Sequence, residues 1–178
     1  KRKLSSTCEF NIKCMGHTVS GQDNVKYLGL NIDKHVSGET IAENVIKKAS
    51  SRLKYLYRQA SFLNQSCRKI LVSALIQCHF DYAVSAWYSG LSQSFKHRLQ
   101  TMQNKMIRFI LVLGTRSHVG KEQLLLSVLL FLNVEKRVRF LKLCHVHKIV
   151  NNNSAGYLQD HFQTISEVHG YRTRGSAY

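Results

Sequence analysis

Proline is absent from all 178 residues of this chain, although average usage of about 5% would supply roughly nine. Proline interrupts helices because it lacks the amide hydrogen and its ring clashes with the preceding turn. Its absence leaves long helices uninterrupted.

Acidic residues are scarce. The chain has 10 Asp and Glu against 26 Lys and Arg, which gives a formal charge of +16 and a pI near 9.9. From Asn44 to Lys121 there are thirteen basic residues and one acidic residue, Asp81. With 44% hydrophobic residues, the chain is not a disordered basic tail, so this charge sits on folded elements. Such an excess suits a polyanionic partner, which favours nucleic acid.

A cysteine framework is also missing. The five cysteines are odd in number, scattered, and without a signal peptide before them: Cys8, Cys14, Cys67, Cys78 and Cys144. This usage predicts thiols in a reducing compartment, hence an intracellular protein, cytoplasmic or nuclear. Cys144 and His147 make one Cys-x-x-His step, and Cys78 neighbours His79. A structural zinc site needs two ligand pairs at defined loop spacing, so no metal site and no catalytic cysteine are expected.

No apolar run is long enough to cross a bilayer. The longest, Leu124 to Leu132, is too short and has charged neighbours, so no membrane anchor is expected. The length allows one core of ordinary size, or two small units.

Strand signals are confined to the start of the chain. Glu9 to Cys14 and His17 to Val19 can pair around Gly16, and Lys26 to Ile32 alternates as a third strand. These segments predict a small sheet.

The pattern turns helical after Gly38, with Ser37 as a plausible cap. Apolar residues recur at three- and four-residue spacing: Ile41, Val45, Ala49, Leu53 and Leu56. At about 100° per residue, Lys47, Lys54 and Arg58 fall on the opposite side. The helix is therefore expected to turn one side to a core and the other to phosphates.

Further helices are expected along the rest of the chain. One runs from Ser66 to Trp87 with a possible break near His79, and one from Ser92 to Leu113 with Gly114 as its cap. Two more are expected near Lys121 to Leu132 and Val134 to Val150. In the Ser92 helix the expected apolar stripe is Phe95, Leu99, Met102, Met106, Phe109 and Leu113, flanked by Arg98, Lys105 and Arg108.

The predicted fold is mainly α, with a small N-terminal β unit at residues 1–36, a helical bundle at 37–114, and a helical extension and tail at 115–178. Tyr82 and Trp87 could stack on bases. Their spacing along a helix with Leu71 and Leu75 favours core packing instead.

Several segments are similar to one known family. They are Val25-Lys26-Tyr27-Leu28-Gly29-Leu30-Asn31-Ile32-Asp33, Phe80-Asp81-Tyr82-Ala83-Val84-Ser85-Ala86-Trp87, Leu99-Gln100-Thr101-Met102-Gln103-Asn104-Lys105-Met106-Ile107-Arg108, and Val134-Glu135-Lys136-Arg137, with shorter pieces at 147–152, 155–158 and 171–174. In order and spacing they resemble the palm end, thumb and post-thumb region of reverse transcriptases from non-LTR, LINE-type retrotransposons of the jockey-like lineages.

The resemblance implies part of an RNA-directed DNA polymerase. The family's palm holds divalent ions on a Tyr-x-Asp-Asp turn, and no two acidic residues are adjacent in this chain. Asp23 and Asp33 stand in no such motif. The chain itself is therefore expected to hold no cofactor. Magnesium and catalysis are expected only with an upstream palm and fingers, and this catalytic half either lies upstream or has been lost.

The resemblance also implies a grip-like role for the first of these segments, with Tyr27 and Gly29 as its key positions. Gly29 would allow close approach of the backbone to nucleic acid. The alternative is a buried strand with Gly29 at a bulge.

The basic helix faces could follow a duplex backbone, whether RNA·DNA or DNA, without reading its sequence. The expected contacts are Lys47, Arg52, Lys54, Arg58, Arg98, Lys105 and Arg108. The alternative is a solvated surface. Three functions stay open: the thumb-side part of a reverse transcriptase, a stand-alone nucleic-acid-binding protein, and a helical module for acidic protein partners.

Overall fold

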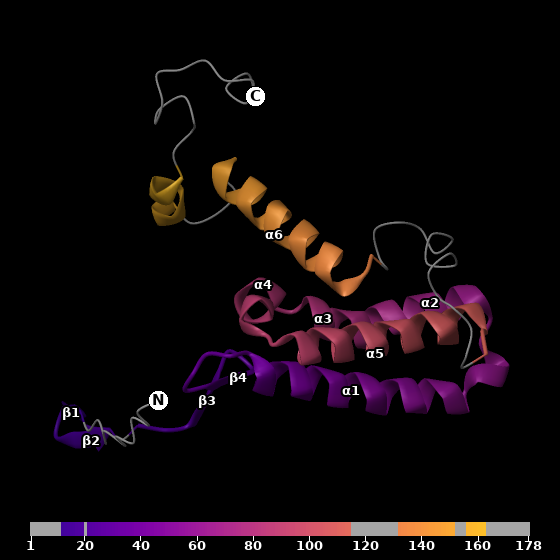
Figure 1. Cartoon of the computed structure of the whole chain (residues 1–178), viewed down its shortest axis with the longest axis horizontal. Coiled ribbons are helices and arrows are strands. Elements are labelled where there is room, and N and C mark those ends of the chain that lie inside the picture. The colour runs from indigo at the N-terminus through magenta and orange to yellow at the C-terminus, as the bar shows by residue number, and fades with distance from the viewer. Residues whose placement is uncertain (1–11, 20, 115–131, 152–155, 163–178) are drawn as a thin grey trace, which may run out of the picture.

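The computed structural model describes residues 12–19, 21–114, 132–151 and 156–162. It confirms the predicted fold class, since helices follow a small antiparallel strand unit (Figure 1). Residues 9–11 of the predicted first strand and 121–131 of a predicted helix lie outside the described residues.

The strands form two separate hairpins, so the predicted single sheet is wrong. Strand β1 (Ile12–Cys14) pairs with β2 (His17–Val19), and β3 (Asn24–Tyr27) pairs with β4 (Leu30–Asp33). The segment expected as one strand from Lys26 to Ile32 is bent by a two-residue turn, in which Leu28 and Gly29 have φ of 46° and 81°. Positive φ at both central residues gives the turn the twist that antiparallel strands need.

Helix α1 (Glu39–Arg58) begins directly after the second hairpin. Its N-cap is Gly38, at φ 76°, and a Cβ there would lie 2.4 Å from the Trp87 carbonyl oxygen. The predicted cap Ser37 stands one residue earlier, where its hydroxyl accepts a hydrogen bond from the Glu39 amide at 3.2 Å. The helix start therefore depends on both residues, one for space and one for a hydrogen bond.

The predicted helix from Ser66 to Trp87 is divided into pieces. After a 3₁₀ turn, η1 (Ala60–Phe62), come α2 (Gln65–Val72), the π-helical η2 (Ser73–Gln77), α3 (Cys78–Asp81), α4 (Val84–Trp87) and the 3₁₀ turn η3 (Tyr88–Gly90). The break lies at Tyr82 and Ala83, not near His79. Ala83 has φ of 47° and lies at a bend of 43° between the two helical stretches.

Helix α5 (Gln93–Leu111) ends three residues before the predicted cap Gly114. Val112 takes the left-handed position, with φ of 57°, and the Leu113 amide donates to the Arg108 carbonyl. A β-branched residue adopts this conformation only at a cost, which glycine would avoid. The hydrogen bond and the packing of the last turn hold it there.

The core lies between α1, α2–α3 and α5, which run side by side (Figure 1). All five predicted apolar positions of α1 are buried. Of the six predicted on α5, four are buried, while Phe95 and Leu113 are half-buried. The largest fully buried side chains are Phe109, Ile76, Leu99, Met106, Ile107, Ile110, Gln103 and Val72.

Of the two aromatic residues assigned to the core, only Trp87 belongs there. Trp87 is 4% exposed, but Tyr82 is 53% exposed, because Tyr82 lies at the bend between α3 and α4 and not within a continuous helix. Leu71 is half-buried and Leu75 is exposed.

Helix α6 (Val134–Val150) has the bounds predicted for it and crosses the bundle obliquely (Figure 1). Asn133 caps it, accepting a hydrogen bond from the Lys136 amide at 2.8 Å. Val134 and Val138 join the bundle core. A 3₁₀ segment, η5 (Gly156–His161), follows it.

Candidate nucleic-acid interface

The hairpin of β3 and β4 presents the two predicted grip positions at its tip. Tyr27 is 62% exposed, and a Cβ on Gly29 would meet nothing within 4 Å. The Tyr82 hydroxyl donates to the Leu28 carbonyl oxygen at 2.7 Å, which ties the tip to α3. Gly29 is therefore a turn residue, neither a bulge nor part of a buried strand, and both positions are open to a partner.

A cleft of about 490 Å³ lies between this hairpin and the helices. Its walls combine apolar residues with polar and basic ones, and none of the lining residues is acidic: Lys26, Gly29, Leu30, Asn31, Ile41, Asn44, Val45, Lys48, His79 and Tyr82. Burial lowers the pKa of His79 from its ordinary 6.5, and the charges of Arg52 and Lys48 lower it further. The imidazole is therefore neutral at pH 7, and the cleft's charge comes from its lysines.

The outer side of α1 carries three of the predicted contacts. Lys47, Lys54 and Arg58 are exposed, and their spacing of seven and four residues aligns them along one line of the helix. That line is opposite the buried stripe through Leu53 and Leu56. The structure thus places these three cations together and facing solvent.

Arg52 differs from these three because its guanidinium already has a partner in the fold. It donates a hydrogen bond to the Leu75 carbonyl oxygen, inside the π-helical segment η2. A π-helix shifts the backbone hydrogen bonds by one residue and leaves a carbonyl available. Arg52 therefore has a structural role beside the predicted one.

On α5, Arg98 is also partly engaged. Its guanidinium lies 3.7 Å from the Glu43 carboxylate of α1 and 4.7 Å from the centre of the Phe95 ring. Both groups of the ion pair are well exposed, so the pair contributes little to stability. A phosphate could compete for this arginine.

The other two predicted α5 contacts lie further along the same flank. Lys105 is exposed and Arg108 is half-buried. Burial raises the pKa of Tyr57 above 10.0, and the charges of Arg108 and Arg68 act in the opposite direction. Arg108 thus lies close enough to the end of α1 for its charge to act on the Tyr57 hydroxyl.

Three side-chain contacts show that α1 and α5 are parallel neighbours. The first is the Glu43–Arg98 pair described above. The Ser50 hydroxyl donates to the Met102 sulfur at 3.4 Å, and the rings of Tyr57 and Phe109 meet edge to face at 4.9 Å. The basic rows of the two helices therefore run in the same direction along one seam. We call this surface the seam face: Lys47, Lys54, Arg58, Arg98, Lys105 and Arg108.

Arg68 is a basic residue whose role the sequence did not reveal. It donates to the carbonyl oxygens of Ala60, Leu63 and Phe109 at 2.6, 3.0 and 3.1 Å, and its guanidinium lies 5.1 Å from the Phe109 ring centre. A cation at helix C-terminal carbonyls is favourable because the helix dipole is negative there. Arg68 thus links the ends of three elements and is not a free contact for nucleic acid.

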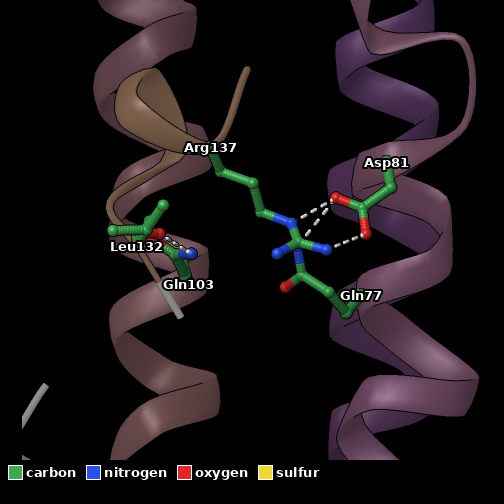
Figure 2. Close-up of polar contacts among 5 residues, drawn as sticks. All are labelled: Gln77, Asp81, Gln103, Leu132 and Arg137. Atoms are coloured by element: carbon green, nitrogen blue, oxygen red, sulfur yellow. Dashed lines mark hydrogen bonds and ion pairs between the residues drawn. The ribbon is translucent and has the colours of Figure 1, made fainter. Parts of the chain in front are cut away.

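The ion pair of Asp81 and Arg137 was also missed. Both Asp81 carboxylate oxygens accept hydrogen bonds from the Arg137 guanidinium, each at 2.6 Å, and Gln77 donates to the same carboxylate at 3.1 Å (Figure 2). The side chains are 26% and 15% exposed. The signal available in the sequence was Asp81 itself, the single acidic residue in the basic middle segment.

The Gln-rich turn of α5 makes a second connection to α6. Gln103 donates to the Leu132 carbonyl oxygen at 2.7 Å (Figure 2), and the Gln100 side chain accepts from the Val134 amide at 2.9 Å. Gln100 also donates to Gln103 and Asn104. These side chains therefore hold the start of α6 and are not directed at a ligand.

The residues described contain no group of three or more His, Cys, Asp or Glu side chains placed to hold a metal ion. Cys67, Cys78 and Cys144 are free thiols. In the same part of the chain no single helix is long and apolar enough to cross a membrane. The bent pair Gln65–Asp81 and Val84–Gly90 passes that test together, by length and composition only.

Comparison of the chain with protein-family models, with curated proteins and with solved structures gave no match.

Proposed function

We propose that this chain is the thumb-side region of a retrotransposon reverse transcriptase and grips the template–primer duplex by its phosphate backbone. Catalysis would come from a palm that carries the acidic pair. The observation that supports this proposal best is the seam face, where six cations lie on two parallel helices. Two rows of cations on rigid helices suit phosphates, which position a duplex without reading its sequence.

The shape of the seam face supports a long ligand. Lys47 and Arg58 are eleven residues apart on one side of α1, which corresponds to about 16 Å of helix. Several phosphates of one strand can lie along such a length. The exposed tip of the second hairpin, with Tyr27 and Gly29, lies at the N-terminal end of the same helix (Figure 1).

A stand-alone nucleic-acid-binding protein would use the same surface. Sequencing the native transcript distinguishes the two, because an in-frame palm upstream would indicate the polymerase. A helical module for acidic proteins is the third candidate. An RNA·DNA hybrid distinguishes it, because duplex binding by phosphate contacts falls steeply with salt, with a log-log slope of about −0.9 per contact. No hybrid binding near physiological salt would contradict the proposal.

The decisive variant is Lys54→Glu with Arg58→Glu, measured by fluorescence anisotropy with a labelled hybrid duplex. We expect weaker binding and a salt slope less steep by about 1.8, since two phosphate contacts are lost. The matched control is Lys13→Glu with Lys148→Glu, the same charge change at exposed positions outside the seam face. Unchanged hybrid affinity in the folded α1 variant would remove the seam face from the proposal, and an equal loss in both variants would indicate overall charge alone.

A further inference from the structure

A second basic surface lies on the α6 side of the bundle, in a groove of about 520 Å³. We call it the α6 groove. Helix α6, the start of α5 and the turn η3 form its walls: Tyr88, Ser89, Lys96, Asn133, Glu135, Lys136, Val138, Arg139 and Lys142. Four of these residues are cationic and one is acidic, although none of the four belongs to the predicted contacts.

The cations of the α6 groove have no carboxylate partner in the described part of the chain. Lys142 donates to the Ser89 hydroxyl at 2.6 Å, and the Lys96 ammonium lies 5.6 Å from the Tyr88 ring centre. Both partners are neutral, so the full positive charge of each lysine stays in the groove. No ion pair is formed there by Lys136 or Arg139 either.

The start of α6 adds to this positive field. Asn133 lines the groove and caps the helix, so the positive end of the helix dipole lies at the same place as the lysines. Glu135 offsets part of the charge, and burial and Glu135 together raise the pKa of Tyr88, which keeps the phenol neutral. The site therefore favours a ligand with several negative charges.

We infer that the α6 groove binds the phosphodiester backbone of a single nucleic-acid strand. Four cations from two helices favour a polyanionic ligand. The volume suits a ligand of nucleotide size, since small-molecule sites span about 300–1,000 Å³. This site is separate from the seam face, so it does not depend on the function proposed above.

The test measures binding of a short labelled oligothymidylate to the full chain over a range of salt. We expect Lys136→Glu with Arg139→Glu to weaken binding and to make the log-log salt slope less steep by about 1.4, since single strands give about 0.7 per contact. Lys96→Gln, from the opposite wall, should lower the slope by about 0.7. The control is Lys13→Glu with Lys148→Glu, the same charge change at exposed positions outside both basic surfaces, which should leave oligothymidylate binding unchanged.

Three results would overturn the assignment. The first is unchanged affinity and slope in the α6 variants, with circular dichroism showing intact helices. The second is an equal loss in the Lys13→Glu, Lys148→Glu control, which would reflect overall charge. The third is tight binding of tripolyphosphate that the α6 variants abolish while oligothymidylate binding persists, which would indicate a small polyphosphate site. Hybrid-duplex binding by the α1 variant is a separate measurement, so failure of the seam face and failure of the α6 groove are distinguishable.

Discussion

Helices α1 and α6 have similar lengths, 20 and 17 residues, but they are held in the fold in different ways. Helix α1 buries six residues along one stripe and exposes cations on the other side. Helix α6 buries three, Val134, Val138 and Ile149, while its outer side exposes the apolar residues Phe140, Leu143, Val146 and Val150. In α1 the buried residues and the cations Lys47, Lys54 and Arg58 thus lie on opposite sides, whereas the outer side of α6 carries apolar residues as well as charged ones.

Polar contacts compensate for the small apolar interface of α6. Its first turns are attached by the Asp81–Arg137 pair and by the Gln100 and Gln103 side chains, and its middle by the Lys142–Ser89 hydrogen bond. Such contacts need particular partners at particular positions, whereas an apolar stripe tolerates exchange of similar side chains. The position of α6 is thus specified mainly by hydrogen bonds, and that of α1 mainly by burial.

The largest expected effect comes from shortening a buried leucine of α1. Leu53 is 4% exposed, so Leu53→Ala should lower the free energy of unfolding by about 2–5 kcal/mol. Leu143→Ala on the outer side of α6 removes the same atoms from a 62% exposed position and should change it by about 0.5 kcal/mol or less. Urea unfolding followed by circular dichroism measures both, and similar losses would erase the contrast between the two helices.

Next in size is the removal of the ion pair that attaches α6. Arg137→Leu leaves the Asp81 carboxylate partly buried and without its cation, and should cost about 3 kcal/mol. Asp81→Leu combined with Arg137→Leu should recover most of this loss, because no charge is then left behind. A double variant as unstable as the single one, in the same urea experiment, would show that Arg137 acts mainly through its packing.

A smaller effect is expected at the helix starts. Asn133→Ala removes the side chain that accepts from the Lys136 amide and should cost about 1 kcal/mol, lost from α6. The N-cap of helix α1 is Gly38, which has no side chain that could form a capping bond. Amide hydrogen exchange localises the loss, and faster exchange in α1 instead of α6 would contradict the expectation.

The smallest effect concerns acid pH. Burial, with Arg52 and Lys48, lowers the pKa of His79 below 6.5 in the folded chain. The unfolded chain therefore binds the proton more readily, so stability falls as pH drops below 6.5 and levels off below the folded pKa. His79→Gln should lose less stability than the parent chain between about pH 8 and about pH 5. Equal losses in both proteins, measured by urea midpoints, would exclude His79 as the group responsible.

Periodic patterns gave reliable predictions of the helices. The buried stripe of α1 follows from repeated apolar spacing, and the bounds of α6 are those predicted. The break at Ala83 and the left-handed end at Val112 could not be predicted, because neither residue favours positive φ by itself. Contacts with other parts of the fold stabilise these conformations, and the local propensities of the residues give no information about such contacts.

The candidate site shows the same division. Exposure of Lys47, Lys54 and Arg58 followed from helix geometry alone. The partners of Arg52 and Arg98 did not, since each lies on another helix, and Arg68 gave no signal that distinguished it from a surface cation. Whether these residues bind nucleic acid stays a prediction.

The π-helical segment η2 sets the angular phase between α2 and α3. Each π turn accommodates about one residue more than an α turn, so Ser73–Gln77 would overshoot if all five residues took regular α geometry instead. All side chains beyond it would then rotate by about 100° around the axis. Asp81 would turn away from Arg137, and Phe80 would leave the core. The π-helical turn therefore accommodates the additional residue while keeping Phe80 directed at the bundle core and Asp81 directed at Arg137 of α6.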